Sequence, residues 1–296
     1  MSNPRIKAAF EDGKAFIPFV TCGDPSLETT KKIIAELAQA GAAVIELGIP
    51  FSDPTAEGPV IQSANMRALE AGTTTDKVFD MVADLRKTID TPFVFMTYAN
   101  VVFHYGIEEF CSRAAEAGVD GLILPDVPFE EKEEVDVVAS RYGIDLISMI
   151  APTSKERIRK IAKGAKGFLY VVSSMGVTGE RTNITTDIDG MLKEIRSVSN
   201  VPAAVGFGIH TPDQAAEMGR RVKKIFSIRK NGVIIFSNSI ENSKTDAGKR
   251  RTRRMGARGK ECGQDGKKES GLGKSRIRLY DNRLPLCGKL QKWCLG

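Results

Sequence analysis

Carboxylates placed at the end of an apolar run could carry proton-transfer chemistry. The stretch ELGIPFSDPTAEGP spans residues 46 to 59 and begins with Glu46, between Ile45 and Leu47. If this run is a strand, Ile45 and Leu47 face one side and Glu46 faces the other. A carboxylate enclosed by aliphatic side chains is costly unless it is paired or protonated, and burial raises its pKa toward the range useful for general acid–base catalysis.

Two further acids, Asp53 and Glu57, lie in the loop that follows. Two carboxylates in one cleft can divide the acid and base roles when their surroundings separate their pKa values. The competing interpretations are structural. Glu46 could form a buried ion pair, and Asp-Pro and Glu-Gly pairs are ordinary turn chemistry.

The elements that must position these acids are visible as eight short runs rich in Val, Ile, Leu and Phe. Unbroken apolar runs of this length favour strands covered on both faces, as in a parallel sheet. Segments with helical spacing separate them, and in the first of these Asp24 is expected to be the N-cap, with Gly41 ending the helix. The expected strands are residues 15–20, 43–49, 93–98, 121–125, 145–150, 168–172, 202–207 and 232–236.

Regular alternation of eight strands with helices predicts an α/β fold, a (β/α)8 (TIM) barrel, with an open doubly wound sheet as the alternative. An internal echo, AQAGAAVIEL at 38–47 and AEAGVDGLIL at 115–124, supports the repeat. In such a barrel, Glu46 points inward and the chemistry lies in the loops after the strands. The second loop, residues 50 to about 72, is the longest and is expected to hold an extra element.

Other candidate ligand contacts follow later strands. The glycine-rich stretches VSSMGVTGERTN (172–183) and GFGIH (206–210) could bring backbone N–H groups close to an anion, or could be simple turns. Phe19, Tyr98 and Tyr170 lie near strand ends and could line a ligand or belong to the core. His104 and His210 are not assigned to catalysis.

Composition indicates a soluble globular protein, and we expect a cytoplasmic location because no apolar stretch is long enough for a membrane span or signal peptide. The five cysteines and two histidines show no ligand spacing, so we expect reduced thiols and no metal. The net charge of +6 conceals two parts. Residues 241–296 hold 16 Lys and Arg against 6 Asp and Glu, leaving 27 basic and 31 acidic residues before them.

Six segments together resemble the tryptophan synthase alpha chain family in order and spacing. The resemblance covers about residues 5 to 218, and its longest segment is the acidic stretch described above. The segments are PFVTCGDP (18–25), ELGIPFSDPTAEGP (46–59), TYANVVFHYG (97–106), LPDVP (124–128), GVTG (176–179) and GFGI (206–209).

The resemblance implies a retro-aldol lyase that splits indole-3-glycerol phosphate into indole and glyceraldehyde 3-phosphate in tryptophan biosynthesis, without a metal or organic cofactor. Glu46 matches the family residue that shuttles the proton. Glu57 stands where many members carry Asp and would steady the indole N–H, so both are expected to be catalytic.

The resemblance also implies a substrate site and a partner. Phe19, Tyr98 and Tyr170 would line the indole, and Thr178 would lie in the mobile loop after the sixth strand. The phosphate would rest on Gly179 and Gly208. Loops two and six would face the beta chain in an alpha2-beta2 tetramer, and pyridoxal phosphate is expected only in that partner.

After Met218 the pattern changes. Residues 231–240 could still supply the last strand, but the closing helix is not evident. Ser237 would match the family's phosphate-binding serine, but Phe236 occupies a glycine position. We therefore expect a lyase domain at 1–240 and a basic, disordered tail at 241–296. The tail could be a nucleic-acid-binding segment, a fused fragment or the product of a shifted reading frame, and the abrupt change favours the last. A chain that only binds and modulates the beta chain, and a nucleic-acid binder acting through the tail, are the alternative functions.

Overall fold

The computed structural model describes residues 2–11, 15–172 and 187–206 and the backbone of 232–237. The chain divides into two compact units, residues 1–239 with 289–296, and residues 240–288. Every described residue belongs to the first unit, and the description below concerns that unit.

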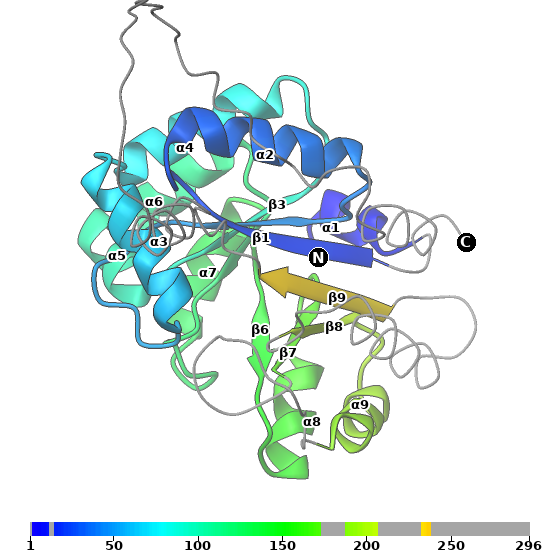
Figure 1. Ribbon diagram of the computed structural model, residues 1–296. Helices are drawn as coiled ribbons and strands as arrows, with labels where there is room; N and C mark the ends of the chain where they lie inside the picture. Colours follow the sequence, from blue (N-terminus) through cyan, green and yellow to red (C-terminus); the bar gives the residue numbers. More distant parts are fainter. Residues whose placement is uncertain (1, 12–14, 173–186, 207–231, 238–296) are drawn as a thin grey trace, which may run out of the picture. The chain divides into compact units, whose positions relative to one another are not determined.

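Strands and helices alternate along the described part of the chain (Figure 1). The strands are β1 (Ala15–Thr21), β2 (Ile45–Gly48), β3 (Phe93–Met96), β4 (Gly121–Ile123), β5 (Asp145–Leu146), β6 (Ser148–Ile150), β7 (Leu169–Val172), β8 (Ala203–Gly206) and β9 (Gly232–Ser237). The helices are α1 (Pro4–Ala9), α2 (Leu27–Gln39), α3 (Pro59–Glu70), α4 (Thr75–Arg86), α5 (Ala99–Tyr105), α6 (Ile107–Ala117), α7 (Glu133–Arg141), α8 (Lys155–Lys163) and α9 (Ile188–Arg196).

All strand pairs are parallel, in the order β5-β4-β3-β2-β1-β9-β8-β7-β6. β9 lies between β1 and β8, so the last strand, which the sequence left uncertain, is present. β5 and β6 are two pieces of one predicted run. β5 pairs with β4, β6 pairs with β7, and the N–H of Ile147 between them donates to the carbonyl of Leu122 at 2.8 Å. This single run therefore joins the two ends of the sheet, and the predicted (β/α)8 barrel is confirmed.

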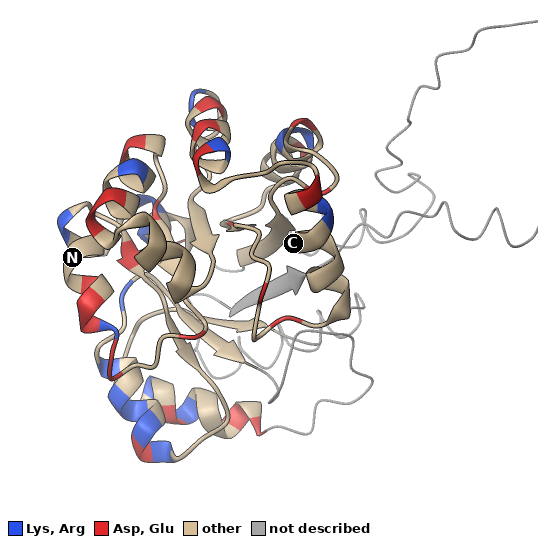
Figure 2. Ribbon diagram, turned by 90° about the vertical axis from the view of Figure 1, so that its left-hand side faces the viewer, with Lys and Arg blue, Asp and Glu red and all other residues tan. Residues whose placement is uncertain are grey.

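The side chains of β2 alternate as the strand period requires. Ile45 and Leu47 belong to a core cluster that also contains the buried faces of α2, α4 and α6. Tyr170, Val94 and Ile17 belong to a second cluster, on the other side of the strands. Charged residues lie mostly on the helices and loops (Figure 2). Apolar residues on both faces of the strands thus form a barrel core inside and a helix-facing core outside.

The long second connection contains the extra element expected from its length. α3 occupies residues 59–70, between β2 and the crossover helix α4. Gly58 is its N-cap and Pro59 is in its first turn, where the missing N–H costs no hydrogen bond. Glu57 is therefore held directly at the start of a helix.

One expected helix start was wrong. The N-cap of α2 is Ser26, whose Oγ accepts from the N–H of Thr29 at 3.2 Å. The peptide bond between Asp24 and Pro25 is cis, and Asp24 lies outside the helix. Its carboxylate binds Arg67 instead. The helix ends at Gln39, and Gly41 follows the C-cap with φ of +86°, as a glycine at this position commonly does.

A buried ionic network lies at the start of β4. Asp120 is fully buried and accepts from Arg86 at 2.9 Å, from Arg5 at 3.0 Å and from the N–H of Phe93 at 2.9 Å. The Arg86 guanidinium also lies 4.2 Å from the centre of the Phe93 ring. Asp120 therefore ties together the starts of β3 and β4, the end of α4, and α1.

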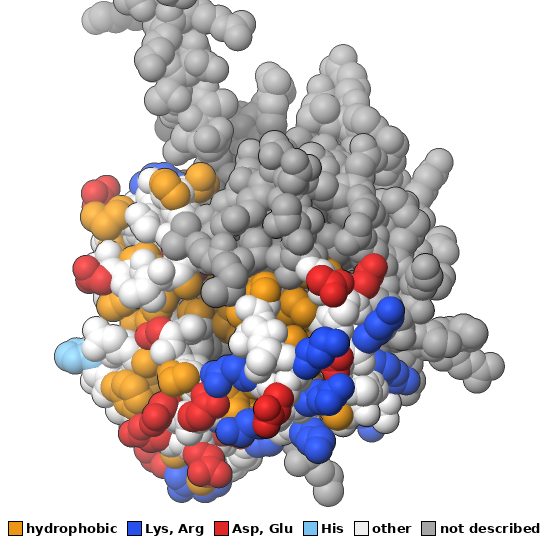
Figure 3. Space-filling model, turned by 90° about the horizontal axis from the view of Figure 1, so that it is seen from below, with side chains coloured by type: hydrophobic (Ala, Val, Ile, Leu, Met, Phe, Trp, Pro, Cys, Tyr) orange, Lys and Arg blue, Asp and Glu red, His pale blue; other side chains and the backbone are white. Residues whose placement is uncertain are grey.

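Basic side chains on α8 are interleaved with acidic partners. Arg157 pairs with Glu130 at 2.8 Å, and Arg159 pairs with Glu194 at 2.6 Å. Figure 3, seen from below, shows Lys and Arg side chains with Asp and Glu among them and hydrophobic side chains nearby. This arrangement gives alternating charges rather than the single-sign surface that favours nucleic acid.

Two remaining sequence expectations concern thiols and membranes. Cys22 and Cys111 are free and buried, and burial raises the pKa of Cys111 to about 11. Neither forms a disulfide, in keeping with the expected reduced thiols, and the other three cysteines lie outside the described residues. Within the described ranges, we find no helix whose length and apolar character would let it cross a bilayer.

Candidate active site

Glu46 is the central residue of the candidate site. It lies in β2, in register with Phe19 of β1 and Val94 of β3, and its side chain is completely buried. Neither carboxylate oxygen has a hydrogen-bond partner among the described residues. Burial, and secondly the negative charge of Glu57, raise the pKa of Glu46 well above its ordinary value. A carboxyl whose pKa is raised can act as a general acid as well as a general base.

The structural ion pair considered for Glu46 is not found within the described part of the chain. An ionised carboxylate without a partner in an apolar interior is strongly disfavoured. The protein retains this group at a cost to its stability, which is typical of a functional residue.

Glu57 lies close enough to Glu46 for the charges to interact, and it reaches the site from the start of α3. It is largely buried, and the Tyr98 hydroxyl donates to its Oε1 at 3.4 Å. The Tyr98 oxygen in turn accepts from the N–H of Ala56 at 3.1 Å. Burial and the Glu57 charge raise the pKa of Tyr98, so its hydroxyl stays protonated and remains a donor to the carboxylate.

Tyr170 contributes a phenol to the site that contains Glu46 and Glu57. It lies on β7, which is separated from β2 by β1, β9 and β8 in the strand order. It lies buried in β7, and burial together with the charges of Glu46 and Glu57 raises its pKa well above the ordinary tyrosine value. A Cβ at Gly206 would lie 2.7 Å from the Tyr170 hydroxyl oxygen. Glycine on β8 therefore makes room for this ring.

Phe19 is placed by a similar close approach. An ideal Cβ at Gly48 would lie only 2.5 Å from Cζ of the Phe19 ring, so the ring packs directly on the β2 backbone. Because Phe19 is the register partner of Glu46, its ring lies beside the carboxylate-bearing strand. An aromatic surface is thereby held next to the acidic group.

The described residues bring together five of the candidates: Glu46, Glu57, Phe19, Tyr98 and Tyr170. Ser237 ends β9, where its backbone is in register with Phe19. Thr178, Gly179 and Gly208 lie outside the described residues.

The loop acids and histidines have different places. Asp53 is exposed and accepts a hydrogen bond from the neighbouring Ser52 hydroxyl, so it does not join the buried pair. His104 is in the last turn of α5, and His210 lies outside the described residues.

Two features of the site were not found from the sequence. Phe51 packs on Tyr98 with ring centres 5.4 Å apart. The position of Phe51 in the segment ELGIPFSDPTAEGP could have suggested a role in the site. A single aromatic residue in a loop does not, however, indicate which side chain it contacts. The second feature is the ion pair of Asp24 with Arg67, which holds α3 against the loop after β1.

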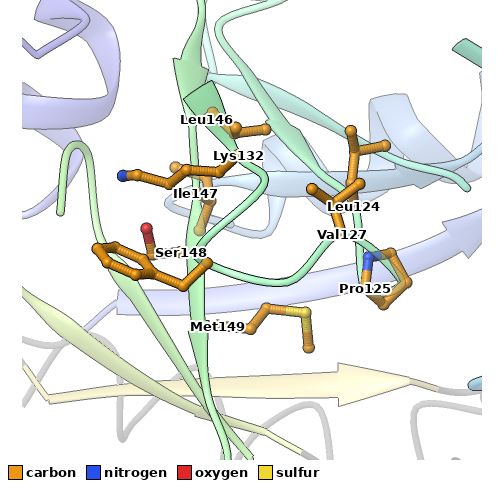
Figure 4. Close-up of a pocket in the computed structure, with 9 residues that line it drawn as sticks. Leu124, Pro125, Val127, Lys132, Leu146, Ile147, Ser148 and Met149 are labelled. Atoms are coloured by element: carbon orange, nitrogen blue, oxygen red, sulfur yellow. The ribbon is translucent and has the colours of Figure 1, made fainter. Parts of the chain in front are cut away.

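A separate pocket opens where the fifth run passes from β4 to β7 (Figure 4). Lys132 is its one charged lining residue, and Lys132 Nζ already donates to the carbonyl of Gly164 at 3.1 Å and lies 3.7 Å from Asp136. The Oγ of Ser148 is buried and lacks a partner among the described residues. The pocket therefore offers an apolar wall without a free charge. It is lined by Leu124, Pro125, Val127, Phe129, Lys132, Leu146, Ile147, Ser148 and Met149.

The described residues contain no cluster of three or more His, Cys, Asp or Glu that could hold a metal ion. The titratable groups that do converge are two carboxyls and two phenols. A parallel (β/α)8 barrel with this arrangement is typical of enzymes that use general acid–base catalysis beside an aromatic-lined surface.

Comparison with known proteins gives the family. The family model described as "Tryptophan synthase alpha chain" matches residues 6–262. The tryptophan synthase alpha chain of Lacticaseibacillus casei is 51% identical over 214 residues, which are 72% of this chain and 80% of that protein. That of Alkaliphilus metalliredigens is 46% identical over 237 residues, 80% of this chain and 85% of that protein. The chain belongs to the tryptophan synthase alpha chain family.

The structural comparison agrees. A chain of the tryptophan synthase complex from Pyrococcus furiosus matches with a TM-score of 0.68 and 31% identity, over 77% of this chain and 88% of that chain. The resemblance inferred from six segments is thus confirmed, and the chain is a lyase of the tryptophan synthase alpha chain family, which acts in tryptophan biosynthesis. The family match also continues past Met218, where the segment resemblance ended.

Proposed function

We propose that Glu46 performs the proton transfers in the retro-aldol cleavage of indole-3-glycerol phosphate, assisted by Glu57. The observation that carries this proposal is a fully buried carboxyl without a hydrogen-bond partner in the described structure, facing a second carboxylate. The products are indole and glyceraldehyde 3-phosphate.

The proton balance can be met by one side chain. Glu46 in its protonated form gives a proton to indole C3, and the resulting carboxylate takes the proton of the hydroxyl on the adjacent side-chain carbon. The bond between C3 and that carbon breaks, its electrons return to the indole ring, and the hydroxyl carbon becomes an aldehyde. Positive charge develops at the indole nitrogen after C3 is protonated. The Glu57 carboxylate stabilises this charge by accepting a hydrogen bond from the indole N–H.

We assign the aromatic residues to the indole and the glycine-rich loops to the phosphate. Phe19, Tyr98 and Tyr170 would contact the ring, since they lie on three different strands or strand ends around Glu46. The phosphate contacts are proposed from the sequence pattern alone and are Gly179, Gly208 and Ser237. Thr178, in the loop after the sixth strand, is proposed as a further substrate contact.

The proposed partner is a tryptophan synthase beta chain, in an alpha2-beta2 tetramer. The structural relative from Pyrococcus furiosus is part of a tryptophan synthase complex, which supports assembly of the same kind. Exposed apolar side chains near the active-site end, Val60 and Met66 on α3 and Phe103 on α5, offer contact area. We propose that pyridoxal phosphate belongs to the partner, that this chain uses no cofactor, and that the enzyme acts in the cytoplasm.

Replacing Glu57 tests its assigned role. We expect Glu57→Gln to lower kcat for indole release about 10- to 100-fold, because a charge-assisted hydrogen bond contributes roughly 1.5–3 kcal/mol. The measurement is indole release from indole-3-glycerol phosphate with a beta chain present. Glu57→Asp, the residue common in the family at this position, is the matched control and should retain most activity.

The pH profile gives a second readout of the same variant. The Glu57 charge contributes to the raised pKa of Glu46, so its removal lowers that pKa. The limb of the pH–rate profile that reports Glu46 should move to lower pH in Glu57→Gln and stay in place in Glu57→Asp. An unchanged rate and an unchanged limb would remove Glu57 from the mechanism.

We propose that residues 1–240 form the lyase domain and that the basic tail is dispensable for turnover. A chain ending at Ile240 retains β9 and every described residue. We expect its kcat to lie within about twofold of the full chain, because the groups around Glu46 are unchanged. The assay compares both chains with the same beta chain. Loss of turnover from a chain that shows cooperative unfolding would assign part of the site to the tail.

A further inference from the structure

Asp24 is a buried carboxylate with a strong and specific partner. It follows β1 by three residues, is only 8% exposed, and sits at the same end of the barrel as Glu46. Arg67 Nε donates to Oδ1 at 2.8 Å and Arg67 Nη2 donates to Oδ2 at 2.7 Å. Two parallel hydrogen bonds of this kind fix orientation as well as distance.

The loop that carries Asp24 is itself well held. The N–H of Gly23 donates to Thr30 Oγ1 of α2 at 3.0 Å. The backbone of Gly23, with φ of +92°, packs so closely on Thr73 that an ideal Cβ would overlap the Thr73 side chain. Asp24 therefore extends from a rigidly held loop. Thr73, which contacts Gly23 of this loop, lies between α3 and α4.

Arg67 is on α3, ten residues after Glu57. The helix is 12 residues long and begins two residues after Glu57. Because a continuous helix moves as one body, the contact of Arg67 with Asp24 restricts how α3 can tilt or rotate. The position of the Glu57 backbone, at the other end of this helix, is restricted with it.

The Glu57 end of the segment has contacts of a different kind. The Tyr98 hydroxyl lies 3.4 Å from Glu57 Oε1, which is long for an O–H donor. Gln62 Nε2 donates to the Glu57 carbonyl at 2.8 Å, but Gln62 is also on α3 and cannot anchor the helix to the barrel. The Asp24–Arg67 ion pair is a short, charged contact between α3 and the loop after β1.

We propose that Asp24 and Arg67 are positioning residues for catalysis, which hold α3 so that Glu57 meets the substrate beside Glu46. This inference rests on the proposed role of Glu57. Neither residue needs to touch the substrate. Their effect on the reaction passes through the Glu57 carboxylate.

The test is a double-mutant cycle between Arg67 and Glu57. Arg67→Lys keeps the positive charge but loses the paired donors, and Asp24→Asn is a second variant that weakens the same contact. In the wild-type background, we expect each to lower kcat for indole release about tenfold with little change in KM. In the Glu57→Gln background, the further loss should be under about twofold.

A control variant and a second readout separate positioning from general destabilisation. Arg86→Lys alters a buried ion pair at the opposite end of the barrel, and its effect on kcat should be the same in both backgrounds. The charge of Glu57 raises the pKa of Glu46, and the charges of both glutamates raise the pKa of Tyr170. A shift of α3 that carries Glu57 away from Glu46 weakens the first of these effects. The pH limb that reports Glu46 should therefore move to lower pH in Arg67→Lys, as in Glu57→Gln.

The outcomes distinguish this inference from the proposed function. Additive losses in the two backgrounds, or a pH limb that stays in place in Arg67→Lys, would overturn the positioning role while leaving Glu57 in the mechanism. A normal kcat in Glu57→Gln alone would overturn both. A large loss in Arg67→Lys that disappears in the Glu57→Gln background would establish the inference.

Discussion

Glu46→Gln should reduce indole release by about 10²- to 10⁴-fold, the range expected when a general acid–base group is lost. Glutamine fills nearly the same space and keeps polar atoms, but it cannot give and take a proton. Because both carboxylate oxygens lack partners among the described residues, no ion pair in that part of the chain is broken by the change. The assay is indole formation from indole-3-glycerol phosphate with a beta chain present.

An exposed glutamate provides the matched control. Glu36→Gln on α2 makes the same chemical change on the outside of the barrel, and it should leave the rate unchanged. If Glu46→Gln kept more than about a tenth of the wild-type rate, proton transfer would have to be assigned to another group.

The same variant should be more stable than the wild-type chain at neutral pH. Folding raises the pKa of Glu46 above its ordinary value of 4.5. As the pH rises past that value, the unfolded chain ionises before the folded one, so stability falls until the folded pKa is passed. Glutamine does not titrate, and its advantage in urea unfolding should therefore grow with pH over this window.

Asp120→Ala should cause the largest loss of stability, about 3–5 kcal/mol in the free energy of unfolding. The substitution leaves Arg86, whose side chain is only 12% exposed, without its carboxylate, and it leaves the N–H of Phe93 without an acceptor. Burial already lowers the pKa of Arg86, so this guanidinium depends on its partner. Urea unfolding measured at pH 7 is the direct test.

An exposed ion pair on α4, the helix that carries Arg86, provides the comparison. Asp80 on α4 pairs with Arg113 at 3.4 Å, and the Asp80 side chain is 73% exposed. Asp80→Ala should change the unfolding free energy by under about 1 kcal/mol. Equal losses in the two variants would mean that the Asp120 network contributes no more than a surface pair. The rate per folded molecule should be normal in Asp120→Ala, because this network is remote from Glu46.

The strands and the orientation of Glu46 could be predicted because both follow from local periodicity. Alternation along Ile45, Glu46 and Leu47 specifies which side chain faces the barrel interior, and the structure places all three as expected. The aromatic candidates were ambiguous from the sequence, because an isolated ring near a strand end has no periodic signal. Only the packing of Gly48 on Phe19 and of Gly206 on Tyr170 shows how the rings are held.

What could not be predicted depends on partners distant in sequence. Asp24 before Pro25 has the local chemistry of a helix cap, but its partner Arg67 lies 43 residues away and determines its role. The break in the fifth run has a similar cause. Residues 145–150 are all buried or half-buried. Their residue types do not indicate that the run stops pairing with β4 and starts pairing with β7 at Ile147.

The place of β9 in the sheet has a consequence for how the chain folds. Most neighbouring strands are close in sequence, but the pairs between β1 and β9 join positions such as Ala15 and Val233, at opposite ends of the domain. Contacts of such high sequence separation form late. While ring closure is pending, β1 and β8 present open strand edges that can pair with another chain. Pairing of β9 with β1 and β8 therefore ends the period in which this barrel is prone to aggregation.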